Sequence, residues 1–279
     1  MGDIAAALAY IQNFENNGGS NVAWHLDRYW TLQRIRRLVQ HPSEINQRGL
    51  NACGPAVFFR IWFARDPLAA ATFACNMLRD GSASIGTLIV ASGWRLLAQD
   101  YALLKSATES AHAGATPENA EWMLLSSLRD SENIFFDYLG EPYTTMDMAA
   151  GVTLPSTLAS WLNATGLYAG VANETSVVYP AGQQRLLSLI PTSDVDIVLL
   201  VSSSFNAGLY PSIPPGVQPP PGGIHIPDHY VLVTAPFAKS TESLWLQFEV
   251  WSWGRVVTGW AGYAQFFTKY FGPLIAKRP

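Results

Sequence analysis

The spacing of apolar residues changes along the chain, and this change limits the folds that the chain can adopt. The segment 53–64 repeats apolar side chains at the three- and four-residue intervals of a helix. The segment 244–253 instead alternates strictly, which places Leu246, Phe248 and Val250 on one face of a strand. Helical patterns fill the first half of the sequence and strand patterns fill the second half. This order predicts an α+β fold in which a mainly antiparallel sheet follows a set of helices.

The two patterns divide the chain into two lobes of one domain, a helical lobe at about 1–165 and a sheet lobe at about 166–279. Proline, glycine and short polar residues mark the ends of the individual elements. Helices are predicted at 30–39, 53–64, 67–79, 85–104, 117–138 and 155–163, and strands are predicted at 196–202, 230–234 and 244–253.

Two of the helix assignments depend on local features. Thr116 followed by Pro117 is typical of an N-cap residue and the first helical position, so a helix is expected to begin there. The apolar run 85–104 contains Arg95, whose charge would be costly in lipid. This run is therefore predicted to be a core helix and not a membrane span, and the segment 81–86 before it is interpreted as a turn between two helices.

A proline-rich segment separates the first two predicted strands. It covers 207–227 and contains the run PSIPPGVQPPPGG, which neither a helix nor a central strand accommodates. The segment ends just before His229. Both a lid over a site and a surface insertion fit this position.

The composition excludes several classes of protein. Hydrophobic residues make up 49% of the chain and charged residues 14%, which is enough apolar material for a large core. The net charge is -4 and no basic stripe is present, so nucleic acid is not an expected partner. The N-terminus lacks the basic segment of a Sec signal peptide. We therefore expect either a cytoplasmic protein or one exported by a route that needs no such signal.

The stretch QRGLNACGPAVFFRIW, at 47–62, contains one of the two cysteines at the start of a predicted helix. The partial positive charge of a helix N-terminus favours a thiolate, so Cys53 is a candidate nucleophile. Asn51 is a candidate cap, and Pro55 fits the first turn. Cys75 lies within an apolar helical pattern and is expected to belong to the core.

A thiol nucleophile also needs a base and donors for the developing oxyanion. His229 begins a predicted strand, so its ring would project from a rigid part of the sheet. Gln47 lies six residues before Cys53 and could supply an amide donor. No cofactor or metal is expected. His225 and His229 do not form a helical ligand pair, because Pro227 stands between them.

These residues resemble the pattern of papain-like cysteine peptidases. The features concerned are Gln47, the segment Cys53-Gly54-Pro55-Ala56, the apolar strand after His229, and the Trp-Gly turn at 253–254. The chain is most similar to the branch that processes bacteriocin leaders. The resemblance implies that Cys53 is the nucleophile, His229 the base and Gln47 a part of the oxyanion hole.

The third catalytic position departs from the family pattern. The family has Asp or Asn about sixteen to twenty residues after the histidine, whereas Trp245 stands sixteen residues after His229. Glu249 and Ser252 follow His229 by twenty and twenty-three residues. Glu249 is slightly favoured because its charge would stabilise an imidazolium, Ser252 aligns better with the turn, and a Cys-His pair without a side-chain partner is a further alternative.

The sequence therefore predicts a cysteine hydrolase that attacks amide bonds of a protein or peptide through the Cys53 thiolate. Peptidase, glutamine deamidase and acyl transferase chemistry all remain open, because they share the same thioester. By analogy with similar stand-alone enzymes, the chain could be an injected bacterial toxin or effector with a cognate partner or inhibitor protein. The alternative is a non-catalytic protein-binding module on the same fold, which the missing Asp or Asn favours.

Overall fold

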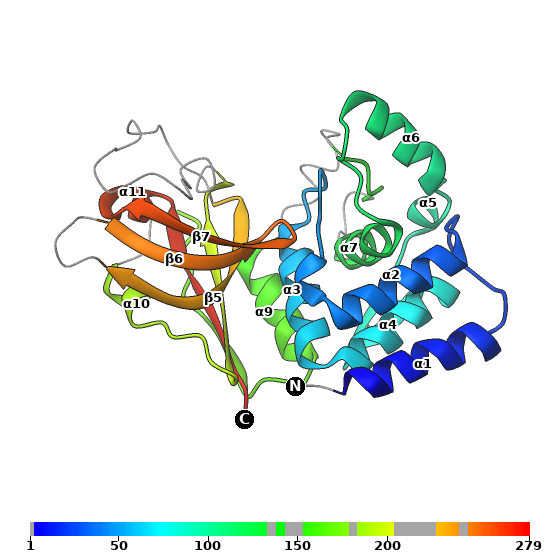
Figure 1. Ribbon diagram of the computed structural model, residues 1–279, viewed down its shortest axis with the longest axis horizontal. Helices are drawn as coiled ribbons and strands as arrows, with labels where there is room; N and C mark the ends of the chain where they lie inside the picture. The colour runs from blue at the N-terminus through cyan, green and yellow to red at the C-terminus, as the bar shows by residue number, and fades with distance from the viewer. Residues whose placement is uncertain (1–2, 133–137, 143–152, 179–182, 204–226, 240–244) are drawn as a thin grey trace. The chain divides into compact units, whose positions relative to one another are not determined.

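The chain forms two structural units in the computed structural model (Figure 1). The first unit ends at Leu154 and the second begins at Pro155. Helices dominate the first unit, and an antiparallel sheet dominates the second, so the α+β prediction is confirmed. The structure describes residues 3–132, 138–142, 153–178, 183–203, 227–239 and 245–279.

Helix α4 lies at the centre of the helical unit, where it contacts α1, α2, α3 and α7. Its neighbour α3 is buried over most of its length: Phe58, Phe59 and Trp62 pack against one another, and Phe59 and Trp62 also pack against Phe73 of α4. Asp66 caps α4 by accepting a hydrogen bond from the Ala69 N–H. The helices of this core are α1 (Ile4–Asn17), α2 (Arg28–Gln40), α3 (Cys53–Arg65), α4 (Pro67–Asp80) and α7 (Asn119–Ser131), with a short 3-10 turn, η1 (Pro42–Glu44).

The prediction of one helix at 85–104 is wrong. The chain forms a β-hairpin there from β1 (Ser82–Ile85) and β2 (Leu88–Ala91), followed by the short α5 (Trp94–Leu97) and by α6 (Tyr101–Ala111). Gly81 ends α4 in the left-handed conformation, and Gly86 turns the hairpin with a φ of 54°. The segment interpreted as a turn between two helices is therefore mainly the first strand of the hairpin.

The start of α7 also differs from the prediction. Glu118, not Thr116, is the N-cap residue, and the helix begins at Asn119. The Glu109 carboxylate accepts hydrogen bonds from the N–H groups of Gly114 and Thr116, which holds the chain in a loop up to this point. The helix ends at Ser131 instead of near 138, and Asp130 accepts a hydrogen bond from the Tyr138 N–H at 3.0 Å.

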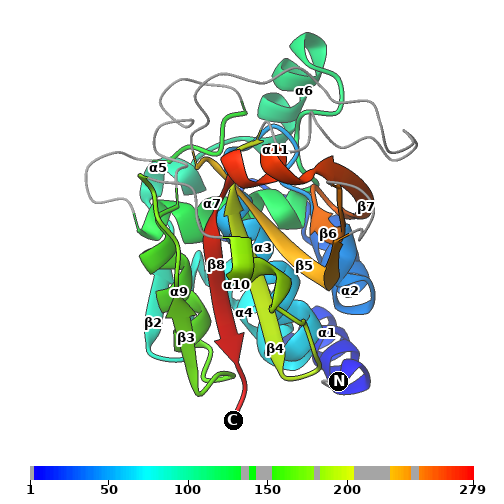
Figure 2. The ribbon, with the colours of Figure 1, turned by 90° about the vertical axis from the view of Figure 1, so that its left-hand side faces the viewer.

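The second unit contains a six-stranded antiparallel sheet with the order β3-β8-β4-β5-β6-β7 (Figure 2). One face of β5 and β6 supplies Val231, Val233, Leu246, Phe248 and Val250 to the hydrophobic core. The strands are β3 (Gly170–Asn173), β4 (Val195–Val201), β5 (His229–Lys239), β6 (Trp245–Ser252), β7 (Arg255–Gly262) and β8 (Tyr270–Lys277). The helices are α9 (Pro155–Ala164), α10 (Gln183–Leu187) and α11 (Tyr263–Thr268).

The three predicted strands of this unit are confirmed as β4, β5 and β6, although β5 continues to Lys239. Helix α9 contacts β3 and β8, so it belongs to the sheet unit and not to the helical one. Most of the proline-rich segment 207–227 lies outside the described residues. Among the described helices, none combines the length and the apolar character that crossing a bilayer requires.

Candidate functional site

Cys53 is the first residue of the thirteen-residue helix α3, as the sequence predicted. Asn51 does not occupy the N-cap position as expected, because the N-cap residue is Ala52, which has no side-chain oxygen to accept a hydrogen bond. Pro55 lies in the first turn and has no N–H group. The thiol is attached to the first residue of the helix, at the positive end of its dipole. The Cys53 side chain is 6% exposed.

The glycine that follows Cys53 has a packing role. A Cβ atom added to Gly54 would lie 2.6 Å from both the Cβ and the Oγ1 of Thr153. Thr153 is itself buried, so it has little room to move. Only glycine lets these two segments approach so closely, which fixes the backbone at the residue next to the thiol.

Gln47 lies in a tight turn of the same unit. The Leu50 N–H donates to the Gln47 carbonyl at 3.0 Å, and the Gly49 N–H donates to the Ala115 carbonyl at 2.7 Å. Arg48 adopts a left-handed φ of 51°, which is uncommon for a residue with a side chain. Gln47 is 7% exposed. The turn therefore places a buried amide side chain shortly before the start of α3.

Cys75 differs from Cys53 in its surroundings. It lies within α4 and is fully buried, as predicted. Burial raises the pKa of the Cys75 thiol to about 12, although Arg28, Arg36 and Arg79 act in the opposite direction. At neutral pH this thiol is therefore protonated and unreactive.

His229 is the first residue of β5 and is 3% exposed. Its Nε2 atom lies 2.8 Å from the Ser252 Oγ atom, at the end of β6. Its ring stacks on Trp253, with 4.3 Å between the ring centroids and 17° between the ring planes. Because Nε2 is bound to Ser252, Nδ1 is the ring nitrogen through which His229 can make a further hydrogen bond.

Trp253 has an unusual backbone conformation. Trp253 and Gly254 form the two-residue turn between β6 and β7, with φ values of 46° and 74°. Both φ values are positive, as in a type I′ hairpin turn, whose first position favours Asn and not a tryptophan. Trp253 adopts this conformation at the place where its ring stacks on His229. The sequence indicated the turn but gave no sign that the Trp253 ring covers the histidine.

Glu249 does not orient His229 in this structure, contrary to the slight preference for it. Val233 pairs with Val250, and neither strand is irregular between these residues and the site. Alternation therefore puts His229 and Ser252 on the core face of the sheet and Glu249 on the opposite face. The Glu249 carboxylate accepts hydrogen bonds from Thr234 Oγ1 at 2.8 Å and Thr258 Oγ1 at 3.4 Å.

The electrostatics of the histidine follow from its burial. Burial lowers the pKa of His229 from 6.5 to about 4. Ser252 carries no charge that could counteract this effect. At neutral pH the imidazole is therefore uncharged and can accept a proton.

The structure thus places Gln47 and Cys53 in the helical unit, and His229, Ser252 and Trp253 in the sheet unit. In the part of the chain that the structure describes, no three His, Cys, Asp or Glu side chains come together as metal ligands. A thiol at a helix start, a buried amide and an oriented neutral imidazole are the components of nucleophilic catalysis on a carbonyl.

Comparisons of the chain with protein-family models, with curated proteins and with solved structures found no match. The chemistry of the chain is therefore inferred from its own residues.

Proposed function

We propose that the protein is a cysteine hydrolase with a papain-like fold that acts on amide bonds of a protein or peptide. The observation that carries the proposal is the fixed orientation of His229, whose Nε2 binds Ser252 and whose ring stacks on Trp253. This arrangement reserves Nδ1 for another group. The position of Cys53 as the first residue of α3 supports the same chemistry.

The proposed reaction begins with a thiol and a neutral imidazole. His229 takes the thiol proton as the Cys53 sulfur attacks the amide carbonyl, and the new C–S bond forms a tetrahedral intermediate. The Cys53 N–H and the Gln47 amide stabilise its oxyanion. The C–N bond then breaks, and His229 gives the proton to the leaving amine. Water hydrolyses the thioester, with His229 again as the base.

The same thioester serves peptide cleavage, glutamine deamidation and transfer to an amine. These outcomes differ in which amide enters the site and in what attacks the thioester. Stand-alone papain-like enzymes, which this chain resembles, include bacterial toxins and effectors. The proposed substrate is therefore a protein of another cell, and the proposed partner of the enzyme is a cognate inhibitor protein.

The proposal is tested by the rate at which iodoacetamide modifies each cysteine between about pH 4 and 9. We expect Cys53 to react about 1,000-fold faster than Cys75 at pH 7, because the raised pKa of Cys75 leaves almost no thiolate. His229→Ala should slow the modification of Cys53 by about 10-fold or more.

Cys75 serves as an internal control for folding in this experiment. If His229→Ala unfolded the protein, Cys75 would become reactive, so a selective loss at Cys53 reports on the site itself. Modification of Cys53 at the same rate in both proteins would contradict the proposal.

A second candidate function is a non-catalytic binding module. The observation that favours it is the burial of His229 beside a neutral hydroxyl, where the family pattern has Asp or Asn. Under this alternative, Cys53→Ala should leave the binding of a captured partner unchanged. An enzyme whose Cys53 is the nucleophile would instead lose all turnover while still binding its substrate.

A further inference from the structure

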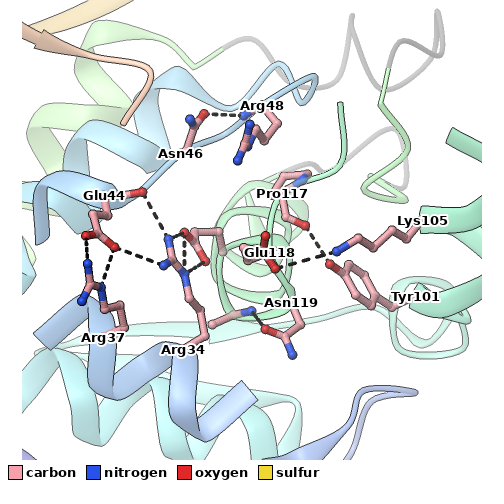
Figure 3. Close-up of polar contacts among 12 residues, drawn as sticks. Arg34, Arg37, Glu44, Asn46, Arg48, Tyr101, Lys105, Pro117, Glu118 and Asn119 are labelled. Atoms are coloured by element: carbon pink, nitrogen blue, oxygen red, sulfur yellow. Dashed lines mark hydrogen bonds and ion pairs between the residues drawn. The ribbon is translucent and has the colours of Figure 1, made fainter. Parts of the chain in front are cut away.

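An open cleft with a volume of about 880 Å³ lies in the helical unit, lined by residues of α2, α6 and the start of α7. None of the residues of α6 is buried, so this helix forms an exposed wall of the cleft. Tyr101, Lys105 and Glu118, which line the cleft, lie close together (Figure 3). The proposed hydrolase does not use any of these side chains.

An exposed tryptophan lines the cleft. Trp30 of α2 is 63% exposed, and its ring contacts Tyr29, which is 54% exposed. Large aromatic side chains that remain in water commonly mark binding sites, because they bury a large area when a ligand covers them. Trp30 therefore provides an aromatic face for a ligand.

The charge of the lining is negative. Asp27, Glu109 and Glu118 contribute carboxylates to it. Arg34 also lines the cleft, but its guanidinium is engaged by the Glu121 and Glu44 carboxylates beneath it. Among the cationic side chains that line the cleft, Lys105 then remains to balance the charge of the three carboxylates. The cleft therefore favours a cationic ligand.

Lys105 indicates how a cation is held in the cleft. Its ammonium lies 3.7 Å from a Glu118 carboxylate oxygen and 5.8 Å from the centroid of the Tyr101 ring. A carboxylate and an aromatic face thus already bind the chain's own cation in this corner. Trp30 offers a second aromatic face in the same cleft.

We propose that this cleft binds an arginine-bearing segment of a partner protein. A guanidinium is planar, so it can stack on Trp30 while its N–H groups donate to carboxylates such as Glu118. The proposal stands independently of the chemistry of Cys53, because the cleft is built from other residues.

The probe is a fluorescein-labelled peptide with three arginines separated by glycines, compared with a peptide that has citrulline in place of each arginine. Citrulline keeps the shape of arginine and removes its charge. Fluorescence anisotropy should show binding of the arginine peptide, weakened between about 50 and 300 mM salt, and much weaker binding of the citrulline peptide. Equal binding of both peptides would mean that the cleft takes a neutral ligand such as a sugar, and would overturn the proposal.

Four variants locate the binding. Trp30→Ala should weaken binding about 5-fold, and Glu118→Gln about 3-fold. Lys105→Met should strengthen it about 3-fold, because the competing cation is gone. The control is Trp94→Ala, which removes a tryptophan that is 75% exposed and does not line the cleft.

Weaker binding of the arginine peptide to Lys105→Met would overturn the proposal, because a ligand that needs the Lys105 ammonium is an anion. An equal loss in Trp30→Ala and Trp94→Ala would also overturn it, since the peptide would then bind exposed tryptophans without selecting the cleft. Each replaced side chain is partly or largely exposed, so circular dichroism spectra of all four variants should match that of the unmodified protein.

Discussion

Each structural unit contains a buried ionisable side chain, but the two side chains have different partners. Glu121 in the helical unit is 1% exposed, and Arg34 Nε lies 3.1 and 3.0 Å from its two carboxylate oxygens. His229 in the sheet unit is 3% exposed, and its partner is the neutral hydroxyl of Ser252. Burial raises the pKa of Glu121 while Arg34 opposes that rise, whereas burial lowers the pKa of His229 to about 4 with no opposing charge.

The difference shows how a charged partner and a neutral partner act on a buried ionisable group. A guanidinium at hydrogen-bond distance offsets part of the loss of water around a carboxylate, but a hydroxyl cannot do the same for an imidazolium. In the proposed reaction His229 therefore starts as a neutral base.

The largest expected effect comes from breaking the charged pair. Glu121→Gln should lower the free energy of unfolding by about 3 to 4 kcal/mol, because Arg34 would lose its bidentate partner in a largely buried site. Urea unfolding followed by circular dichroism measures this change.

The matched control for Glu121→Gln is Glu118→Gln on the same helix end. The Glu118 side chain is 50% exposed and lies 3.7 Å from Lys105, so its loss should cost less than about 0.5 kcal/mol. Similar costs for the two variants would mean that the contact between Glu121 and Arg34 adds nothing to stability.

The next effect is the response of His229 to acid. Between pH 6.5 and about 4 the unfolded chain binds a proton that the folded chain does not, so stability decreases as the pH falls. This contribution is present in full above pH 6.5 and is lost below about pH 4. It amounts to roughly 3 kcal/mol, and urea unfolding at a series of pH values measures it.

Carboxylates also titrate in acid, so the free energy of unfolding must be compared between the unmodified protein and His229→Gln. The difference between the two isolates the contribution of His229. That difference should shrink by roughly 3 kcal/mol between pH 7 and pH 4. A difference independent of pH would show that His229 keeps an ordinary pKa, and the contrast with Glu121 would disappear.

Part of the fold follows directly from the sequence. The alternation in 244–253 predicted β6, because one face of a half-buried strand must be apolar. The run at 85–91 was mistaken for a helix because its apolar residues also suit helical spacing. Gly86 turns this run back on itself, and Val90 is buried while Ile89 is exposed, which is strand periodicity on a hairpin too short to be clear from the pattern.

The candidate site shows where prediction from sequence stops. Cys53 at the start of α3 and His229 at the start of β5 follow from local patterns. The choice between Glu249 and Ser252 depends on which face of β6 meets the histidine, and the pairing of Val233 with Val250 decides it. Strand register is a property of two distant segments, so the pattern of either strand alone could not supply it.

A carboxylate beside the histidine would convert the neutral site into one that resembles the pair of Glu121 and Arg34. Ser252→Asp should raise the pKa of His229 by about 1 to 2, because an anion would then stabilise the imidazolium. The acid-dependent loss of stability should shrink accordingly. Ser252→Asn is the matched control, since it has the same shape without the charge. If stability depended on pH in the same way in both variants, a charge at position 252 would have no effect on the pKa of His229.

The smallest effect is expected for Glu249→Gln. The Glu249 carboxylate lies on the opposite face of the sheet from His229 and accepts hydrogen bonds from Thr234 and Thr258, which a Gln side-chain oxygen can also accept. Stability should change by less than about 0.5 kcal/mol, and the pH profile of His229 should not change. Iodoacetamide should modify Cys53 at the same rate as in the unmodified protein. If Glu249→Gln instead moved the pH profile as much as Ser252→Asp does, the charge that governs His229 would come from Glu249, and the neutral hydroxyl of Ser252 would not account for the behaviour of the histidine.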